Sequence, residues 1–257
     1  MLFRSGSWSG SGTVSCGAGS VLENDNIFTA QNDAIFAGYT GGVGTFVNNG
    51  TFRKTTATGS TVFQQELGGG SIAFNNNGTV DLRTGSLAIN SSYTLSGSPQ
   101  LKLVLGGLNP GTQFSQETFA GAATLGGSLS VTLTNGFMPT NGQSFALATY
   151  SSSSGQLSST QFPPLPVQSQ WKLSYTVNSL LLQVVPSNVF QTTALTNGNF
   201  QFTFQGQTGS SCFIEVSTNL FNWAPLLTNT PFNGILNYVD PQTTQFSKRF
   251  YRATIFP

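Results

Sequence analysis

The sequence predicts an all-β protein: a parallel β-helix (solenoid) with a capping region, followed by a small β-sandwich-like domain. Only 7% of the residues are charged, and small polar residues are abundant, but 22 Phe residues supply material for a core. Apolar residues alternate with a period of two, as at 101–105, 129–133 and 171–177. No segment combines a 3.6-residue period with helix caps, so we expect almost no helix.

A repeated unit in the first hundred residues predicts the solenoid. The string FVNNGTF at 46–52 matches FNNNGTV at 74–80, a spacing of 28 residues (46 to 74), and 12–14 is a weaker echo. Asn-Gly accepts a positive φ in a tight turn, and the Thr that follows begins a half-buried strand. Repetition at this period is typical of stacked rungs. Two ordinary hairpins are the alternative interpretation.

Composition predicts two domains. We expect residues 1–186 to contain the repeats, at about 5–92, and then a cap of longer strands separated by Gly and Pro turns, at about 93–186. Residues 187–257 are expected to form a separate β-sandwich-like module, with Phe200, Phe202 and Phe204 on one face. A module this small is near the lower limit for an independent core, and its aromatic residues would compensate.

The first domain resembles the repeats of large exported bacterial proteins of the autotransporter type, whose passengers form a right-handed parallel β-helix. The resemblance covers residues 5–186 and implies a fold more than an activity. The repeats are matched at 74–82, 85–87 and 123–131, and the region that closes such a helix at 135–139 and 142–147.

The C-terminal module resembles a small β domain that ends large secreted proteins of environmental bacteria. Residues 213–220 with Trp223, then Asp240-Pro241 and 249–253, carry this resemblance. It implies a terminal accessory or attachment module without catalytic residues. The chain has no counterpart of the translocating domain of autotransporters, which puts self-translocation in doubt.

The N-terminal residues and the charge pattern bear on location and partners. Met1 to Arg4 run directly into a Gly- and Ser-rich string, so no signal peptide is visible, and no apolar run is long enough for a transmembrane helix. We therefore expect a fragment of a longer extracellular or cell-surface chain, with an upstream part. The net charge of +1 without a basic cluster argues against nucleic acid as a partner.

The residue inventory argues against an enzyme. The chain has no histidine, which excludes Ser-His-Asp and Cys-His mechanisms and His-containing zinc sites. A polysaccharide enzyme based on carboxylates is a third, weaker hypothesis, since it needs a close acidic pair. The carboxylates show no repeated pair along one strand face: Glu23, Asp25, Asp33, Glu66, Asp81, Glu117, Glu215 and Asp240.

Few residues are candidates for a binding site. Glu23 and Asp25 alternate with amides and could bind calcium, although such residues are also ordinary turn formers. We expect no other cofactor. Trp223 could stack on a sugar ring, although the nearby leucines suggest packing instead. Cys16 and Cys212 lack metal-binding spacing, and their pairing is left open.

These observations favour a non-catalytic structural or adhesive segment of a secreted or cell-surface bacterial protein. The alternative is a carbohydrate-binding accessory module of a protein that acts on polysaccharides. Partners would be extracellular polysaccharide or surface proteins. Four charged residues are expected to form ion pairs that contribute little to stability: Asp81, Arg83, Glu215 and Arg252.

Overall fold

The structure, a computed structural model, describes residues 2–39, 41–65, 69–166 and 169–256. It is 59% strand and 1% helix, which confirms the all-β class. The chain divides into two compact units: 1–139, 143–164 and 171–183 form unit 1, and 140–142, 165–170 and 184–257 form unit 2. Glu66, one of the carboxylates named above, lies outside the described residues.

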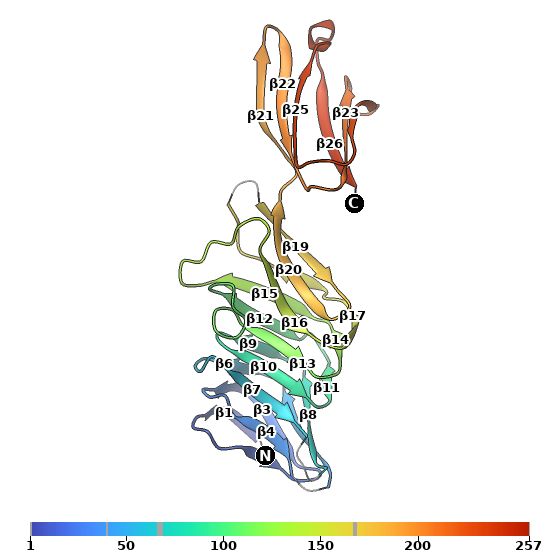
Figure 1. Cartoon of the computed structure of the whole chain (residues 1–257). Helices are drawn as coiled ribbons and strands as arrows, with labels where there is room; N and C mark the ends of the chain where they lie inside the picture. Colours follow the sequence, from blue (N-terminus) through green and yellow to red (C-terminus); the bar gives the residue numbers. More distant parts are fainter. Residues whose placement is uncertain (1, 40, 66–68, 167–168, 257) are drawn as a thin grey trace. The chain divides into compact units, whose positions relative to one another are not determined.

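Unit 1 is a parallel β-solenoid of about five turns, which confirms the predicted repeat fold (Figure 1). Its largest sheet has the strand order β11-β8-β5-β3-β6-β9-β12-β15-β18, with β1 also paired to β3. These strands are β1 (Leu2–Trp8), β3 (Val21–Ala30), β5 (Val43–Asn48), β6 (Thr51–Lys54), β8 (Ser71–Asn76), β9 (Thr79–Leu82), β11 (Tyr93–Leu95), β12 (Gln100–Leu105), β15 (Ser128–Leu133) and β18 (Ser159–Gln161).

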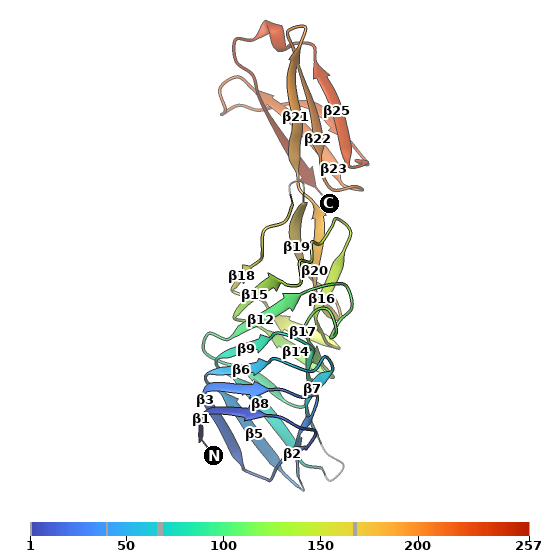
Figure 2. The same cartoon turned by 90° about the vertical axis from the view of Figure 1, so that its left-hand side faces the viewer.

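A second sheet, of order β19-β20-β16-β13-β10-β7-β4-β2, forms another wall, and β14 pairs with β17 in a small third sheet (Figure 2). Their strands are β2 (Val14–Cys16), β4 (Ile35–Gly38), β7 (Ser60–Gln64), β10 (Ser86–Asn90), β13 (Gln116–Phe119), β14 (Ala122–Leu125), β16 (Ser144–Thr149), β17 (Ser152–Gly155), β19 (Ser169–Tyr175) and β20 (Ser179–Pro186).

The sequence repeat corresponds to one turn of the solenoid. Phe46 in β5 lies in register with Phe74 in β8. The weaker echo at 12–14 was wrong, because Val14 begins β2 in the other sheet and pairs with Phe36. The first-turn counterpart is instead the segment around Asn24, in β3, whose first half pairs with β5 and second half with β6.

Parallel pairing continues beyond residue 92, into the region predicted as a cap. β12 pairs with β15, β14 with β17 and β15 with β18, all in parallel. Antiparallel pairing enters the second sheet, where β20 lies against β16 through Ser179 to Gln183. The stack of parallel strands therefore extends through the region that the sequence predicted as a cap. At the end of the stack, β20 reverses the strand direction.

Phenylalanines fill the interior of the early turns. Phe63 stacks on Phe36 and on Phe74, with ring centroids 4.7 Å apart in both pairs. Burying one such ring contributes about 2–3 kcal/mol. Each turn buries its rings only against its neighbours, so the core grows along the stack. The buried rings of these turns are Phe28, Phe36, Phe46, Phe52, Phe63 and Phe74.

A ladder of buried asparagines fixes the corner between the two halves of the large sheet. The Asn24 amide donates to Oδ1 of Asn48 at 2.7 Å, and the Asn48 amide donates to Oδ1 of Asn76 at 2.8 Å. The amides of Asn24 and Asn48 also donate to the carbonyl oxygens of Thr51 and Thr79. Since the ladder requires one Asn per turn at the same place, it selects a single register.

The glycines of the two Asn-Gly turns serve a different purpose from the one the sequence suggested. Neither Gly50 nor Gly78 has a positive φ. A Cβ on Gly50 would lie 2.1 Å from the Asn26 carbonyl oxygen, and one on Gly78 would lie 2.1 Å from the Gly50 carbonyl oxygen. Successive turns therefore approach too closely at this corner for any side chain, and stacking, not turn geometry, requires glycine.

Unit 2 is a β-sandwich of two three-stranded antiparallel sheets, β21-β22-β25 and β24-β23-β26, so the predicted module fold is confirmed. Residues from both sheets form one core that contains Phe202 and Phe204 from one side and Cys212 and Ile214 from the other. The elements are β21 (Val189–Thr196), β22 (Asn199–Gln205), β23 (Ser211–Ser217), β24 (Ala224–Asn229), β25 (Ile235–Asp240), the short helix η1 (Thr243–Gln245) and β26 (Phe250–Phe256).

We predict that Asn48→Ala lowers the free energy of unfolding by roughly 2–4 kcal/mol, because several buried polar atoms lose their partners at once. Asn77→Ala is the matched control, since Asn77 donates to Asn49 in an exposed position. It should cost less than about 1 kcal/mol. Urea unfolding followed by circular dichroism measures both, and equal losses would contradict a dominant role for the buried ladder.

Candidate functional site

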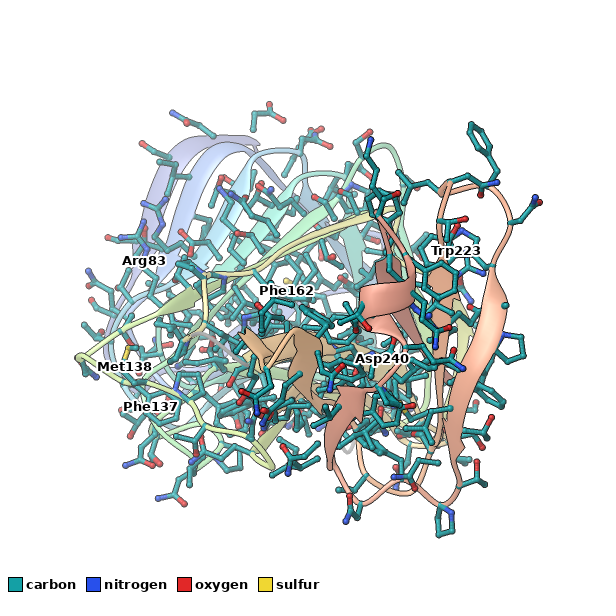
Figure 3. All side chains as sticks on the ribbon, turned by 90° about the horizontal axis from the view of Figure 1, so that it is seen from above. Arg83, Phe137, Met138, Phe162, Trp223 and Asp240 are labelled. Carbon is teal, nitrogen blue, oxygen red and sulfur yellow. The ribbon has the colours of Figure 1, made fainter. Side chains whose placement is uncertain are left out.

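Trp223, the predicted sugar-stacking residue, is half-buried at the start of the segment that leads into β24 (Figure 3). Its indole nitrogen donates to the Leu220 carbonyl oxygen at 3.1 Å. The Arg252 guanidinium lies over its ring, 4.4 Å from the centroid, and makes two hydrogen bonds to Glu215. One face of the indole is therefore covered, which leaves at most the other face for a ligand.

The loop before Trp223 exposes more apolar surface than the sequence suggested. Leu220 was expected to pack, but it is 55% exposed and has a φ of 66°. Phe221 is 88% exposed. Asn219 fixes this loop, because its Oδ1 accepts hydrogen bonds from the amides of residues 221 and 222. The loop is thus a rigid turn that presents an aromatic side chain to solvent.

Glu23 and Asp25, the predicted calcium ligands, belong to an outer ladder beside the buried one. The Asn49 side-chain amide donates to Oε1 of Glu23 at 3.0 Å and to Oδ1 of Asp25 at 2.9 Å. A donor between the two carboxylates stabilises their charges without a cation. Among the residues that the structure describes, no group of three or more Asp, Glu, His or Cys side chains gathers into a metal-binding cluster.

The other titratable residues named from the sequence have structural surroundings. The predicted ion pairs are confirmed: Nε of Arg83 lies 3.1 Å from Oδ2 of Asp81, and Nε of Arg252 lies 2.7 Å from Oε2 of Glu215. Cys16 and Cys212 are free, buried thiols, and burial raises the pKa of each. No helix in the described part of the chain is long and apolar enough to cross a membrane.

Sequence reasoning missed a buried carboxyl group inside the solenoid. Glu117 is 4% exposed in β13, in register with Leu87 on one side and Ala148 on the other. Its Oε1 has no hydrogen-bond partner. The alternation with buried Phe119 could have revealed this position, because both residues must face the same side of the strand.

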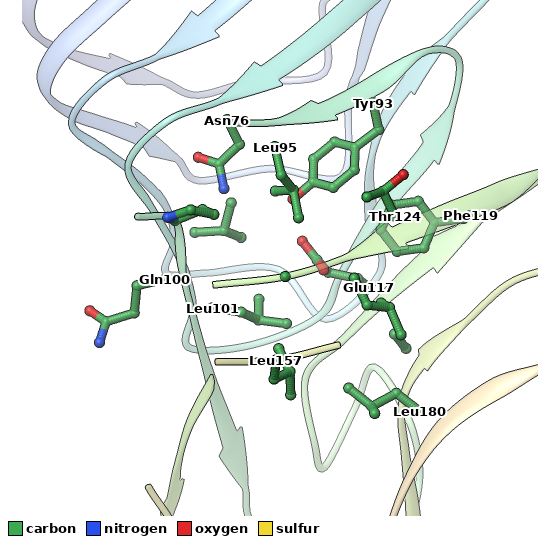
Figure 4. Close-up of a pocket in the computed structure, with 15 residues that line it drawn as sticks. Asn76, Tyr93, Leu95, Gln100, Leu101, Glu117, Phe119, Thr124, Leu157 and Leu180 are labelled. Atoms are coloured by element: carbon green, nitrogen blue, oxygen red, sulfur yellow. The ribbon is translucent and has the colours of Figure 1, made fainter. Parts of the chain in front are cut away.

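Glu117 points into a small apolar cavity toward Tyr93 (Figure 4). The cavity measures about 30 Å³, which is enough for a water molecule but not for a sugar. Burial raises the pKa of Glu117 from its usual 4.5 to about 8. Burial also raises the pKa of Tyr93, and so does the Glu117 carboxylate, while a side-chain hydrogen bond with Asn76 opposes the rise. Both groups are neutral at mildly acidic pH.

Two larger clefts lie in unit 2, on either side of Phe246 and Arg249. One measures about 430 Å³ and the other about 350 Å³. Volumes in this range suit small organic ligands. Neither cleft includes Trp223 among its lining residues. The sequence offered no signal for these clefts, because each forms where the segment between β25 and β26 meets strands that are distant in the sequence: β21 and β22 in the first cleft, β23 and β24 in the second.

We predict that the Glu117 carboxyl makes unit 1 less stable as pH rises. The unfolded chain loses this proton near pH 4.5 and the folded chain near pH 8, so stability is highest below pH 4.5 and falls between these values. The loss amounts to roughly 3–5 kcal/mol. Thermal or urea unfolding at pH 4.5 and pH 8 measures it.

Glu117→Gln should match the parent chain at pH 4.5 and exceed its stability at pH 8. Glu215→Gln is the control, since Arg252 lowers the pKa of that exposed carboxyl and the fall in stability toward pH 8 should remain. A Glu117→Gln chain that keeps the same fall would show that another group causes it.

Comparison with known proteins returns no match: no protein-family model, no curated protein and no solved structure is similar to this chain. The resemblance to autotransporter-like passengers is therefore supported only as far as the parallel β-solenoid itself.

Proposed function

We propose that this chain is a non-catalytic structural segment of a secreted or cell-surface protein, in which the solenoid acts as a stiff support for displayed or adhesive parts. The continuous interior of unit 1 carries this proposal. Buried aromatic rings and the asparagine ladder of Asn24, Asn48 and Asn76 link each turn to the next. Such a stack resists local opening, because a turn cannot leave without exposing its neighbours.

The surface composition supports the same function. Only 7% of the residues are charged, and the described ion pairs of unit 1 involve few groups, such as Arg53 with Asp81 and the buried Lys54 with Asp33. Stacked strands tolerate small polar side chains, since these bond to one another along the stack. A surface of this kind suits a protein exposed to proteases more than one that recognises charged partners.

We expect antibodies against the purified chain to label intact cells of the source organism, or to detect the protein in the culture medium. Brief proteinase K treatment of intact cells should remove flexible neighbours and leave a resistant fragment that contains residues 5–161. Asn48→Ala should shorten the lifetime of this fragment, because the hydrogen bonds of residue 48 with Asn24 and Asn76 are lost. Labelling that appears only after cell lysis would overturn the proposed location.

A carbohydrate-binding accessory module is the second candidate, and the exposed aromatic loop favours it. Phe221 and the uncovered face of Trp223 lie two residues apart on a rigid turn. Aromatic faces are the usual contact for sugar rings at protein surfaces.

If this loop binds sugar, Trp223→Ala or Phe221→Ala should each abolish binding on a glycan array, with and without a calcium chelator. Trp8→Phe, which changes a buried ring in unit 1, should leave the array signal unchanged. An array that stays silent with the parent chain would remove this candidate and leave the structural role.

A further inference from the structure

Unit 2 has an open cleft at the end of its sandwich where β21 turns into β22 and where the segment after β25 leads into β26. Its volume is about 430 Å³. Both sheets contribute to the walls, so the sandwich framework holds the cleft in shape. The lining residues are Thr193, Ala194, Leu195, Phe200, Thr243, Phe246, Ser247, Lys248, Arg249 and Tyr251.

The charged residues of this cleft, Lys248 and Arg249, are both cations. Lys248 is exposed and forms no ion pair among the described residues. Arg249 faces the Asp240 carboxylate, so Lys248 supplies the unpaired positive charge of the cleft. The cleft therefore attracts an anion.

Arg249 is incompletely satisfied within the protein. Its Nε lies 2.9 Å from Oδ2 of Asp240, but without the alignment of a hydrogen bond, and its buried Nη1 has no partner. Its side chain is only 6% exposed. Asp240 is already supplied with donors by Tyr251 and by the Gln242 amide. The Asp240 carboxylate therefore only partly satisfies the Arg249 guanidinium, whose positive charge adds to that of Lys248 along the cleft.

The remaining wall is apolar and partly open to solvent. Leu195 is 71% exposed and Phe246 is 41% exposed, and the Phe246 ring also covers the Arg249 guanidinium at 4.5 Å. Half-buried Phe200 stacks on Tyr251, with centroids 4.5 Å apart. An apolar wall beside positive charge suits an organic anion with an apolar face. A small inorganic anion such as sulfate would make no contact with this wall.

We propose that this cleft binds an acidic sugar residue, a hexuronate of an anionic polysaccharide. The carboxylate meets the exposed Lys248, the charge of the neighbouring Arg249 adds to the attraction, and the apolar face of the ring lies against Leu195 and Phe246. The exposed hydroxyls of Thr193 and Ser247 meet the ring hydroxyls. A neutral sugar brings no negative charge to Lys248. The site differs from the Trp223 loop and does not depend on the supporting role of the solenoid.

The test is isothermal titration of the full chain with trigalacturonate, in low salt and without calcium, beside the neutral trisaccharide maltotriose. Trigalacturonate should bind and maltotriose should not. Lys248→Gln should weaken binding about 5- to 20-fold, the value of one charge-assisted hydrogen bond. Phe246→Ala should weaken it by a similar factor through loss of the apolar contact.

Lys172→Gln is the matched control, since it removes the same charge from an exposed strand position of unit 1 and should leave affinity unchanged. Equal weakening by Lys172→Gln and Lys248→Gln would mean diffuse charge attraction and overturn the site. Absence of trigalacturonate binding would also overturn it. Tighter binding of the tripeptide Ala-Ala-Ala, which carries a terminal carboxylate, would reassign the cleft to peptide ends.

Discussion

The structure of unit 1 depends on one constraint: the equivalent corners of successive solenoid turns stack in a single register. Asn24 bonds to Asn48 and Asn48 bonds to Asn76, and beside them Asn26, Gly50 and Gly78 bring the backbones of successive turns into contact. A slip of one residue would turn the buried amides outward and bring phenylalanines to the surface, so the register has no close competitor. The corner thereby places the aromatic rings above one another, and the core follows from it.

The interior changes where this ladder ends. The position opposite Asn76 in the next turn is Leu95, which cannot continue the chain of amide bonds. Tyr93 contacts Asn76 instead, and Glu117 lies nearby beside a cavity. The later turns replace stacked phenylalanines with smaller aliphatic residues such as Leu129 and Val131. A carboxyl without a partner is tolerated at this transition because it can remain protonated, at a cost that rises with pH.

The sequence predicted the parts of the fold that repeat or alternate locally. The match of Phe46 with Phe74 revealed the turn length, and the alternation of Phe202 and Phe204 revealed a face of unit 2. It did not reveal Asn24 as the first member of the ladder, because the first turn is shorter (24 to 48, against 48 to 76) and breaks the period. The hydrogen bonds to Glu23 and Asp25 also depend on a residue one turn away, which no local pattern specifies.

The proposed cleft was hidden for a related reason. Arg249 and Asp240 lie on opposite sides of the segment that contains η1, and only the folded sandwich brings the guanidinium to the carboxylate. An exposed lysine without an ion pair is not distinctive by itself, because Lys102 and Lys172 also form none among the described residues, whereas the buried Lys54 pairs with Asp33. Exposed pairs contribute little in any case. Lys248 differs from the other two in its place, beside an incompletely satisfied arginine on an open apolar cleft, and this combination indicates a site for an external anion.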